Sequence, residues 1–201
     1  AGSAGLAISG GVGTMTKNAY AKRKKEDFGK VKSINVECVS ETSWFDNDVF
    51  KKDIMDYGGA MTNQYTIPWK WDNAGGYAVL ITVTTLEGQE RKFMMDFGWN
   101  NEWMDYIYEE KSDVASLISK DEIEFWVLSH WHLDHYWGVE STLKRKQDIT
   151  LYAPATYYPE DMALLKDKAH HTAKNKETGE MDHICKNDYP HKGKLVLCNP
   201  D

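Results

Sequence analysis

Four side chains that can bind a metal ion lie within six residues of this chain, directly after a short apolar run. The run, residues 124–128 (EFWVL), has the composition of a buried strand. The ligand candidates in the loop that follows are His130, His132, Asp134 and His135. Zinc and iron favour neutral imidazole, with carboxylate as a harder partner. Loop histidines without a metal are the alternative, but this density of ligands after a strand favours a metal site.

The spacing of these ligands favours two neighbouring metal positions. A loop that leaves a strand can direct His130 and His132 to one point, and Asp134 and His135 to a second point nearby. Two close ions can share a bridging water, which ionises near neutral pH and attacks a carbonyl or phosphorus centre. We therefore predict a hydrolytic site in which Asp134 has a catalytic as well as a metal-binding role.

Strands and helices alternate along the rest of the chain, which favours a mixed α/β fold with helices packed against a sheet. The predicted strands are 31–40, 77–86, 91–95, 124–128, 149–153 and 195–198. The predicted helices are 102–119, with Asn101 as its N-cap, then 139–146 and 159–168. A turn at 87–89 joins the second and third strands as a hairpin. Residues 41–75 are too long for an ordinary loop, so they hold short elements or have a function.

Two further features accompany the histidine motif. Asp96-Phe97-Gly98 follows a predicted strand, and Gly138 follows the histidine loop. Together with His-x-His-x-Asp-His, these residues resemble the metallo-β-lactamase fold superfamily, which usually carries Asp-Thr-Gly at the upstream position. The resemblance implies an αββα sandwich, with mainly its N-terminal half in this chain. It also implies that His130 and His132 bind one metal, that Asp134 and His135 bind a second, and that Asp96 supports the ligand loop from behind.

Within the superfamily, three stretches resemble the branch of 7,8-dihydropterin-6-methyl-4-(β-ribofuranosyl)aminobenzene-5′-phosphate synthase-like proteins. They are SETSWFDN at 40–47, AGGYAVLI at 74–81, and the motif Ser-His-x-His-Leu-Asp-His-x-Trp-Gly from Ser129. Some exported bacterial proteins of that branch are described only as hydrolases, so this narrower resemblance implies little about the substrate.

The resemblance also implies ligands that are not evident in this sequence: a third histidine, a bridging aspartate and a last histidine. His191 lies 56 residues after His135, a spacing that compact members use for the third ligand, but no clear strand precedes it. We interpret His170 and His171 as the end of a helix, and His183 as a surface or loop residue. Because the chain ends just after a strand, we expect more polypeptide beyond Asp201.

The first 21 residues differ from the remainder. Residues 1–16 carry no charge, and Ala19-Tyr20-Ala21 matches a signal-peptidase site ahead of a basic run. We predict an export signal of the twin-arginine type at 1–21 and the domain at 22–201, hence a bacterial periplasmic or extracellular location. A flexible Gly/Ala tail or an artificial extension is the alternative. In an oxidising compartment Cys185 and Cys198 could pair.

Charge and aromatic content limit the partners. The net charge of −7 disfavours nucleic acid, and the sequence has no apolar run long enough for an ordinary membrane span. We expect a small-molecule substrate and leave open whether the protein forms a homo-oligomer.

Three aromatic residues, Tyr65, Trp69 and Trp71, form either a substrate lid over the metal site or part of the internal packing.

The sequence as a whole predicts a metal-dependent hydrolase that uses a hydroxide bound to one or two ions, Zn²⁺ first and Fe or Mn as alternatives. Ester, lactone, phosphoester and amide substrates stay open. An exported binding or assembly protein with secondary or lost catalysis is the second hypothesis. A di-iron oxidoreductase is the third, but Trp131 stands where those relatives usually carry Glu.

Overall fold

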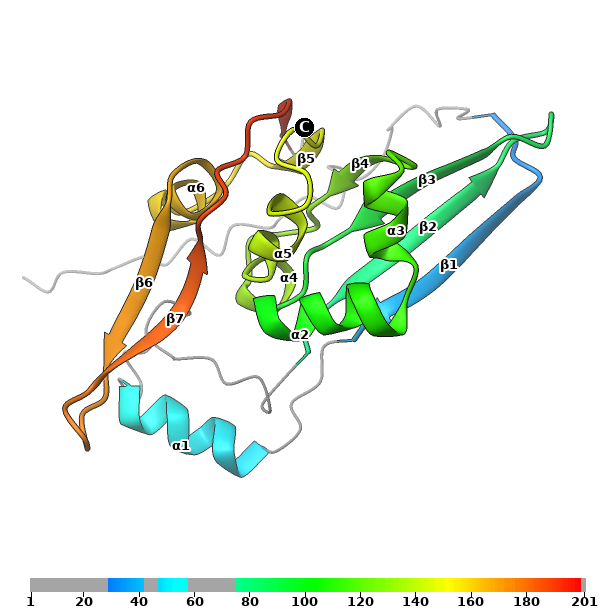
Figure 1. Cartoon of the computed structure of the whole chain (residues 1–201). Helices are drawn as coiled ribbons and strands as arrows, with labels where there is room; N and C mark the ends of the chain where they lie inside the picture. Colours follow the sequence, from blue (N-terminus) through cyan, green and yellow to red (C-terminus); the bar gives the residue numbers. More distant parts are fainter. Residues whose placement is uncertain (1–28, 42–46, 58–74, 200–201) are drawn as a thin grey trace, which may run out of the picture. The chain divides into compact units, whose positions relative to one another are not determined.

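The computed structural model describes residues 29–41, 47–57 and 75–199 (Figure 1). The chain divides into two units, 1–30 and 31–201, and every helix and strand described below belongs to the second. The expectation of a mixed α/β fold is confirmed. No helix in the described ranges has the length and hydropathy of a membrane span.

Six strands form the main sheet, in the order β1-β2-β3-β4-β5-β8. They are β1 (Ser33–Ser40), β2 (Ala78–Thr84), β3 (Glu90–Met95), β4 (Ile123–Val127), β5 (Leu151–Pro154) and β8 (Leu195–Cys198). The first three pair antiparallel, and β2 and β3 form the predicted hairpin. The strands from β3 to β8 are parallel. The carboxyl ends of β4, β5 and β8 therefore meet at one edge of the sheet.

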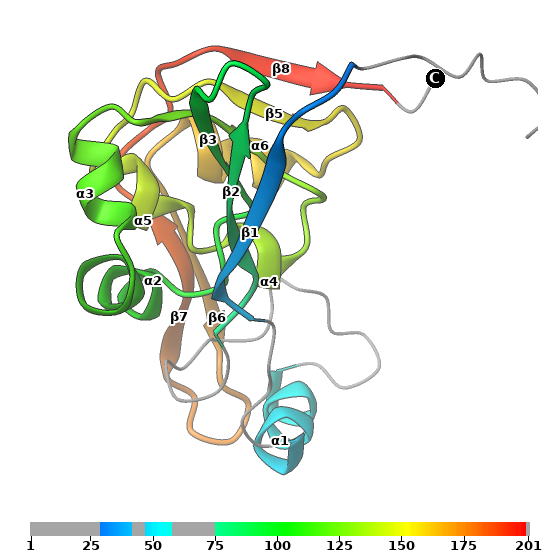
Figure 2. The same ribbon diagram turned by 90° about the vertical axis from the view of Figure 1, so that its right-hand side faces the viewer.

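One face of this sheet packs against helices. The helices on this side are α2 (Asn101–Tyr106), a π-helical turn (Ile107–Lys111), α3 (Val114–Ser119) and α5 (Val139–Leu143), as Figure 2 shows. Met94, Trp126 and Leu151 point to these helices by strand alternation and are fully buried in the same core cluster. Burial of so much apolar surface is the main force that holds the helices to the sheet.

The opposite face of the sheet carries apolar side chains that are only partly covered. Ile34 and Val36 on β1 are 60% and 61% exposed. Farther along the same face, the rings of Phe93 and Phe125 stack with centroids 4.8 Å apart. An αββα sandwich has its second sheet on such a face, so the described residues supply one helical layer and the first sheet of that architecture.

The remaining elements lie outside the main sheet. They are α1 (Asn47–Tyr57), α4 (Leu133–Tyr136), α6 (Pro159–Lys166) and the antiparallel strands β6 (Ala169–Lys174) and β7 (Met181–Asn187). The placement of His170 and His171 at a helix end is wrong, because α6 ends at Lys166 and both lie in β6. His183 lies in β7 rather than in a loop. Exposure alternates along β6, as expected for a strand with one covered face.

Two other local expectations need correction. The helix predicted at 102–119 is interrupted, because Ser112 is extended between the π-helical turn and α3. Its N-cap is Asn100 rather than Asn101, since the Asn100 side chain accepts hydrogen bonds from the backbone amides of Glu102 and Trp103. Cys185 and Cys198 do not pair in the part of the chain that the structure describes: the first is buried and the second exposed.

Candidate metal centre

Asp96 occupies the turn that ends β3, and its carboxylate is fully buried beneath the histidine loop. It accepts hydrogen bonds from the backbone amide of Ser129 (2.7 Å), from the Ser129 hydroxyl (2.8 Å) and from Nδ1 of His135 (2.7 Å). Its φ of 63° is uncommon for a residue with a side chain. Such a conformation persists only where the surroundings enforce it, which is common at functional sites.

These hydrogen bonds determine which ring nitrogen of each histidine keeps a lone pair with which it could bind a metal ion. A carboxylate only accepts, so Nδ1 of His135 carries the proton and Nε2 keeps its lone pair. The Ser129 hydroxyl donates to Asp96 and therefore accepts from Nδ1 of His130, 3.0 Å away. His130 consequently keeps the lone pair of Nε2 as well. One buried carboxylate orients both histidines, the first through a serine and the second directly.

The backbone of the loop is held by two neighbouring turns. The amide of Phe97 donates to the carbonyl of His135 (2.8 Å), and that of Tyr77 donates to the carbonyl of Asp134 (2.6 Å). The turns approach so closely that glycine is required at Gly138, where a Cβ would lie 2.3 Å from the Phe97 carbonyl oxygen. This close approach explains why a glycine ends the loop.

The loop brings the predicted ligands together at the carboxyl end of β4. The ring centroid of His130 lies 4.5 Å from that of His132 and 4.2 Å from that of His135. Oδ2 of Asp134 is 3.5 Å from Nε2 of His135. His132 is exposed and the other three side chains are half-buried, so the cluster is open to solvent on one side.

Burial and neighbouring charges act differently on the two inner histidines. The pKa of His130 is lowered, first by burial and then by the nearby rings of His135 and His132. Burial also lowers the pKa of His135, but the hydrogen bond to Asp96 and the charges of Asp134 and Asp96 outweigh it, so the net pKa is raised. The neutral form that metal binding requires is thus favoured at His130.

The donor types suit zinc, since three imidazoles and a carboxylate are among its usual ligands and two of the rings have their Nε2 lone pairs oriented. Across the described residues, however, no three His, Cys, Asp or Glu side chains converge closely enough to hold an ion. The ligand roles, the catalytic role of Asp134 and the supporting role of Asp96 therefore stay predictions. Tyr65, Trp69 and Trp71 lie outside the described residues.

The later histidines differ from those of the loop. Nε2 of the buried His191 donates to the carbonyl of Ile149 (2.8 Å), and its Nδ1 lies 3.3 Å from Nζ of Lys166. Both ring nitrogens of His191 therefore contact other groups of the protein, so this histidine has a structural role in the fold. Nε2 of His170 lies 2.8 Å from the Asp188 carboxylate.

Sequence reasoning missed two residues of this region. It named Ser129 only as the start of a motif, but the hydroxyl links Asp96 to His130. It used Trp131 only as an argument against a di-iron site. The buried Trp131 ring instead donates its Nε1 proton to the carbonyl of Pro154 (3.0 Å), which ties the histidine loop to the end of β5. Their positions inside the motif are the only signal that could have identified them.

Comparison with a protein-family model supports the same fold. The family model described as "Metallo-beta-lactamase superfamily" matches residues 74–184, more than half of the chain. A solved structure described as "Crystal structure of a long form RNase Z from yeast" is 19% identical, with a TM-score of 0.36. The match covers 62% of this chain but only 15% of the yeast chain. A search of curated proteins found no match. On the family match, this chain belongs to the metallo-β-lactamase superfamily.

Proposed function

We propose that this chain carries the first ligand half of a metal-dependent hydrolase site. Members of its superfamily are generally metal-dependent hydrolases. The observation that supports the proposal most strongly is the Asp96–Ser129–His130 and Asp96–His135 hydrogen-bond network. A purely structural histidine needs no fixed lone pair, whereas a metal ligand does.

The residues of the chain would act in three ways. His130 and His132 would hold one zinc ion, and Asp134 and His135 a second. Asp96 keeps the Nδ1 protons in place, which leaves Nε2 of each inner ring as the nitrogen that would bind an ion. Bound zinc supplies Lewis acidity and makes a coordinated water acidic near neutral pH. Ester, lactone, phosphoester and amide substrates are all compatible with that chemistry.

The test compares two variants of the 201-residue chain. His132→Ala removes an exposed imidazole of the predicted site, and His170→Ala removes an exposed imidazole outside it. We expect His132→Ala to lose most bound zinc in equilibrium dialysis and any zinc-dependent hydrolysis of 4-nitrophenyl acetate. His170→Ala should retain both. Stoichiometric zinc in His132→Ala would overturn the ligand assignment.

An exported binding or assembly protein with secondary catalysis is the second candidate. It is favoured by the finding that no three ligand side chains in the described ranges converge on one point. Zinc-independent stability together with no hydrolysis of any ester would support this candidate over the enzyme.

We further propose membership of the 7,8-dihydropterin-6-methyl-4-(β-ribofuranosyl)aminobenzene-5′-phosphate synthase-like branch, a small-molecule substrate and export from a bacterial cell. The export proposal rests on the composition of residues 1–21 and the Ala19-Tyr20-Ala21 pattern. N-terminal sequencing of the protein from its native source should find a mature chain that begins at Lys22. A mature chain that retains Ala1 would contradict export by this signal.

A further inference from the structure

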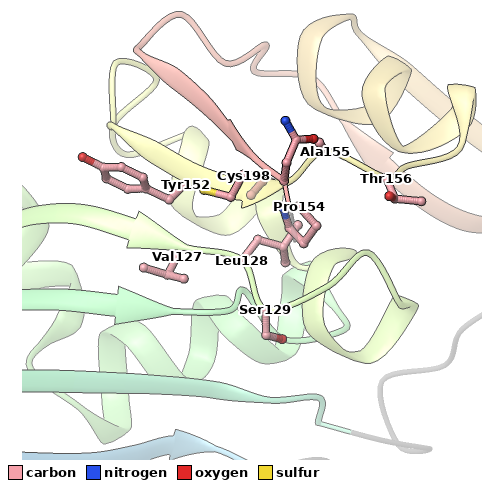
Figure 3. A pocket seen from close by; sticks show the side chains of 10 residues that line it. Val127, Leu128, Ser129, Tyr152, Pro154, Ala155, Thr156 and Cys198 are labelled. Atoms are coloured by element: carbon pink, nitrogen blue, oxygen red, sulfur yellow. The ribbon is translucent and has the colours of Figure 1, made fainter. Parts of the chain in front are cut away.

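A hollow of about 390 Å³ lies at the carboxyl ends of β4, β5 and β8 (Figure 3). Its lining includes Val127, Ser129, Tyr152, Pro154, Thr156 and Cys198. Ser129 belongs both to this lining and to the hydrogen-bond network of the histidine loop. The hollow therefore adjoins the candidate metal centre at Ser129, although none of the four predicted ligands lines it.

The chemistry of the lining is uncharged. It holds no Asp, Glu, Lys, Arg or His, and most of its side chains are apolar. The polar groups in the lining belong to Ser129, Thr156, Asn199 and the hydroxyl of Tyr152. Its volume falls within the range of small-molecule sites, which combine apolar walls with a few polar groups. The carboxyl ends of parallel strands are also where open α/β sheets bind ligands.

The walls of the hollow are fixed to the histidine loop. The indole of Trp131 donates to the carbonyl of Pro154 (3.0 Å), which joins the loop to one wall. The amide of Ala155 donates to the carbonyl of Cys198 (2.9 Å), and that of Leu128 to the carbonyl of Tyr152 (2.8 Å). A ligand held in the hollow would thus have a defined position relative to His130.

We propose that this hollow seats an uncharged, apolar acyl group of the substrate, which favours an acyl ester, lactone or amide over a phosphoester whose phosphate would have to occupy the hollow. The inference rests on the hydrolase function proposed above. A phosphate seated in the hollow would meet no charged side chain among the residues that line it. In the reaction the acyl bond to the leaving group breaks, the oxygen of water bonds to the acyl carbon, and a proton passes to the leaving group.

Two exposed cysteines provide a direct binding test. Cys198 lines the hollow, whereas Cys38 lies on β1 at the other edge of the sheet. Benzamide, a neutral apolar probe, should slow alkylation of Cys198 by iodoacetamide in a saturable manner, by about fivefold or more at high concentration. Cys38 should react at its original rate. Phenyl phosphate, of similar size but charged, should protect neither cysteine.

The rates are measured by mass spectrometry of the modified peptides. Absence of protection at Cys198, equal slowing at both cysteines, or equal protection by phenyl phosphate would each overturn the proposal. Cys185 is buried, and burial raises the pKa of its thiol well above the ordinary value, so it contributes little background.

A pair of matched substitutions tests the location. Thr156→Trp places a large ring in the hollow, and Thr172→Trp makes the same change on the exposed side of β6. We expect Thr156→Trp to abolish protection of Cys198 and Thr172→Trp to preserve it. The kinetic readout, with zinc present, is the KM for 4-nitrophenyl hexanoate divided by the KM for 4-nitrophenyl acetate. Thr156→Trp should raise this ratio about tenfold, because the longer acyl chain would lose the burial of roughly two methylene groups. Protection that survives Thr156→Trp would overturn the proposal.

The alkylation test needs neither metal nor turnover, so its failure can be told apart from failure of the proposed function. Protection of Cys198 without zinc-dependent hydrolysis would sustain the hollow as a ligand site and refute the hydrolase. Hydrolysis without protection would refute the hollow as the acyl site and leave the hydrolase standing.

Discussion

In the loop after β4, hydrogen bonds use one nitrogen of each inner histidine and leave the other available. Nδ1 of His130 bonds to Ser129 and Nδ1 of His135 to Asp96, while the ring of His130 lies against the rings of His132 and His135. In the segment after α6, both nitrogens of His191 are in contacts with the surrounding protein. There, His170 pairs with a carboxylate at the surface.

The difference separates a functional arrangement of histidines from a structural one. A ligand histidine is held on one side and keeps a lone pair on the other. A packing histidine is satisfied on both sides, because a buried ring nitrogen without a partner is costly. The three predictions that follow test this contrast between the histidine loop and the segment that ends at His191.

The largest effect is expected for Asp96→Asn. Asparagine tolerates the positive φ, but its amide cannot accept all three hydrogen bonds that the carboxylate receives. Loss of such a supporting group typically weakens metal affinity about 10- to 100-fold. Zinc competition with a chromophoric chelator measures the change. Asp161→Asn alters another fully buried aspartate, which accepts from the amide of Tyr158, and should leave zinc affinity unchanged. Equal affinities for Asp96→Asn and the parent protein would remove the role of Asp96.

A smaller effect concerns the pH dependence of stability. Burial lowers the pKa of His191, and the charge of Lys166 adds to this, although the hydrogen bond to the Ile149 carbonyl opposes it. The unfolded state therefore takes up the proton first as pH falls. The stability that this group contributes is complete above its ordinary value of 6.5 and is lost as pH falls through the lower folded value.

His191→Gln should accordingly make the free energy of unfolding depend less on pH. Urea titrations at about pH 7.5 and pH 5.5 provide the two values. The half-buried rings of His130 and His171 also have lowered pKa values, so some of the dependence should persist. An unchanged pH dependence would show that His191 is not neutral in the folded state.

The smallest effect is expected for His170→Gln. Both side chains of the His170–Asp188 pair are exposed. Exposed ion pairs often contribute nothing measurable to the free energy of unfolding, because solvent screens their charges. The melting temperature should change little, and zinc binding should not change at all. A large loss of melting temperature would mean that this pair, rather than the packing of β6 on β7, holds the hairpin.

Much of the architecture follows from local patterns. The β2–β3 hairpin, β4 and its histidine loop, and α6 with proline in its first turn all agree with the sequence. The break after Lys111 and the strand at Ala169–Lys174 do not. Residues 102–119 have helical periodicity throughout, and residues 169–174 have no strong strand composition, so local propensity favoured the wrong structure in both.

By itself, the sequence determined which chemistry the site could carry: four candidate ligands of two types in six residues after a buried strand, and a family motif that needs no long-range information. Only the tertiary structure decided which groups support them. Asp96 reaches Ser129 across 33 residues of chain, and Trp131 reaches Pro154 across 23. The parallel pairing of β4 with β3 and β5 sets these distances. Such contacts depend on how the whole sheet packs, which no local stretch of sequence specifies.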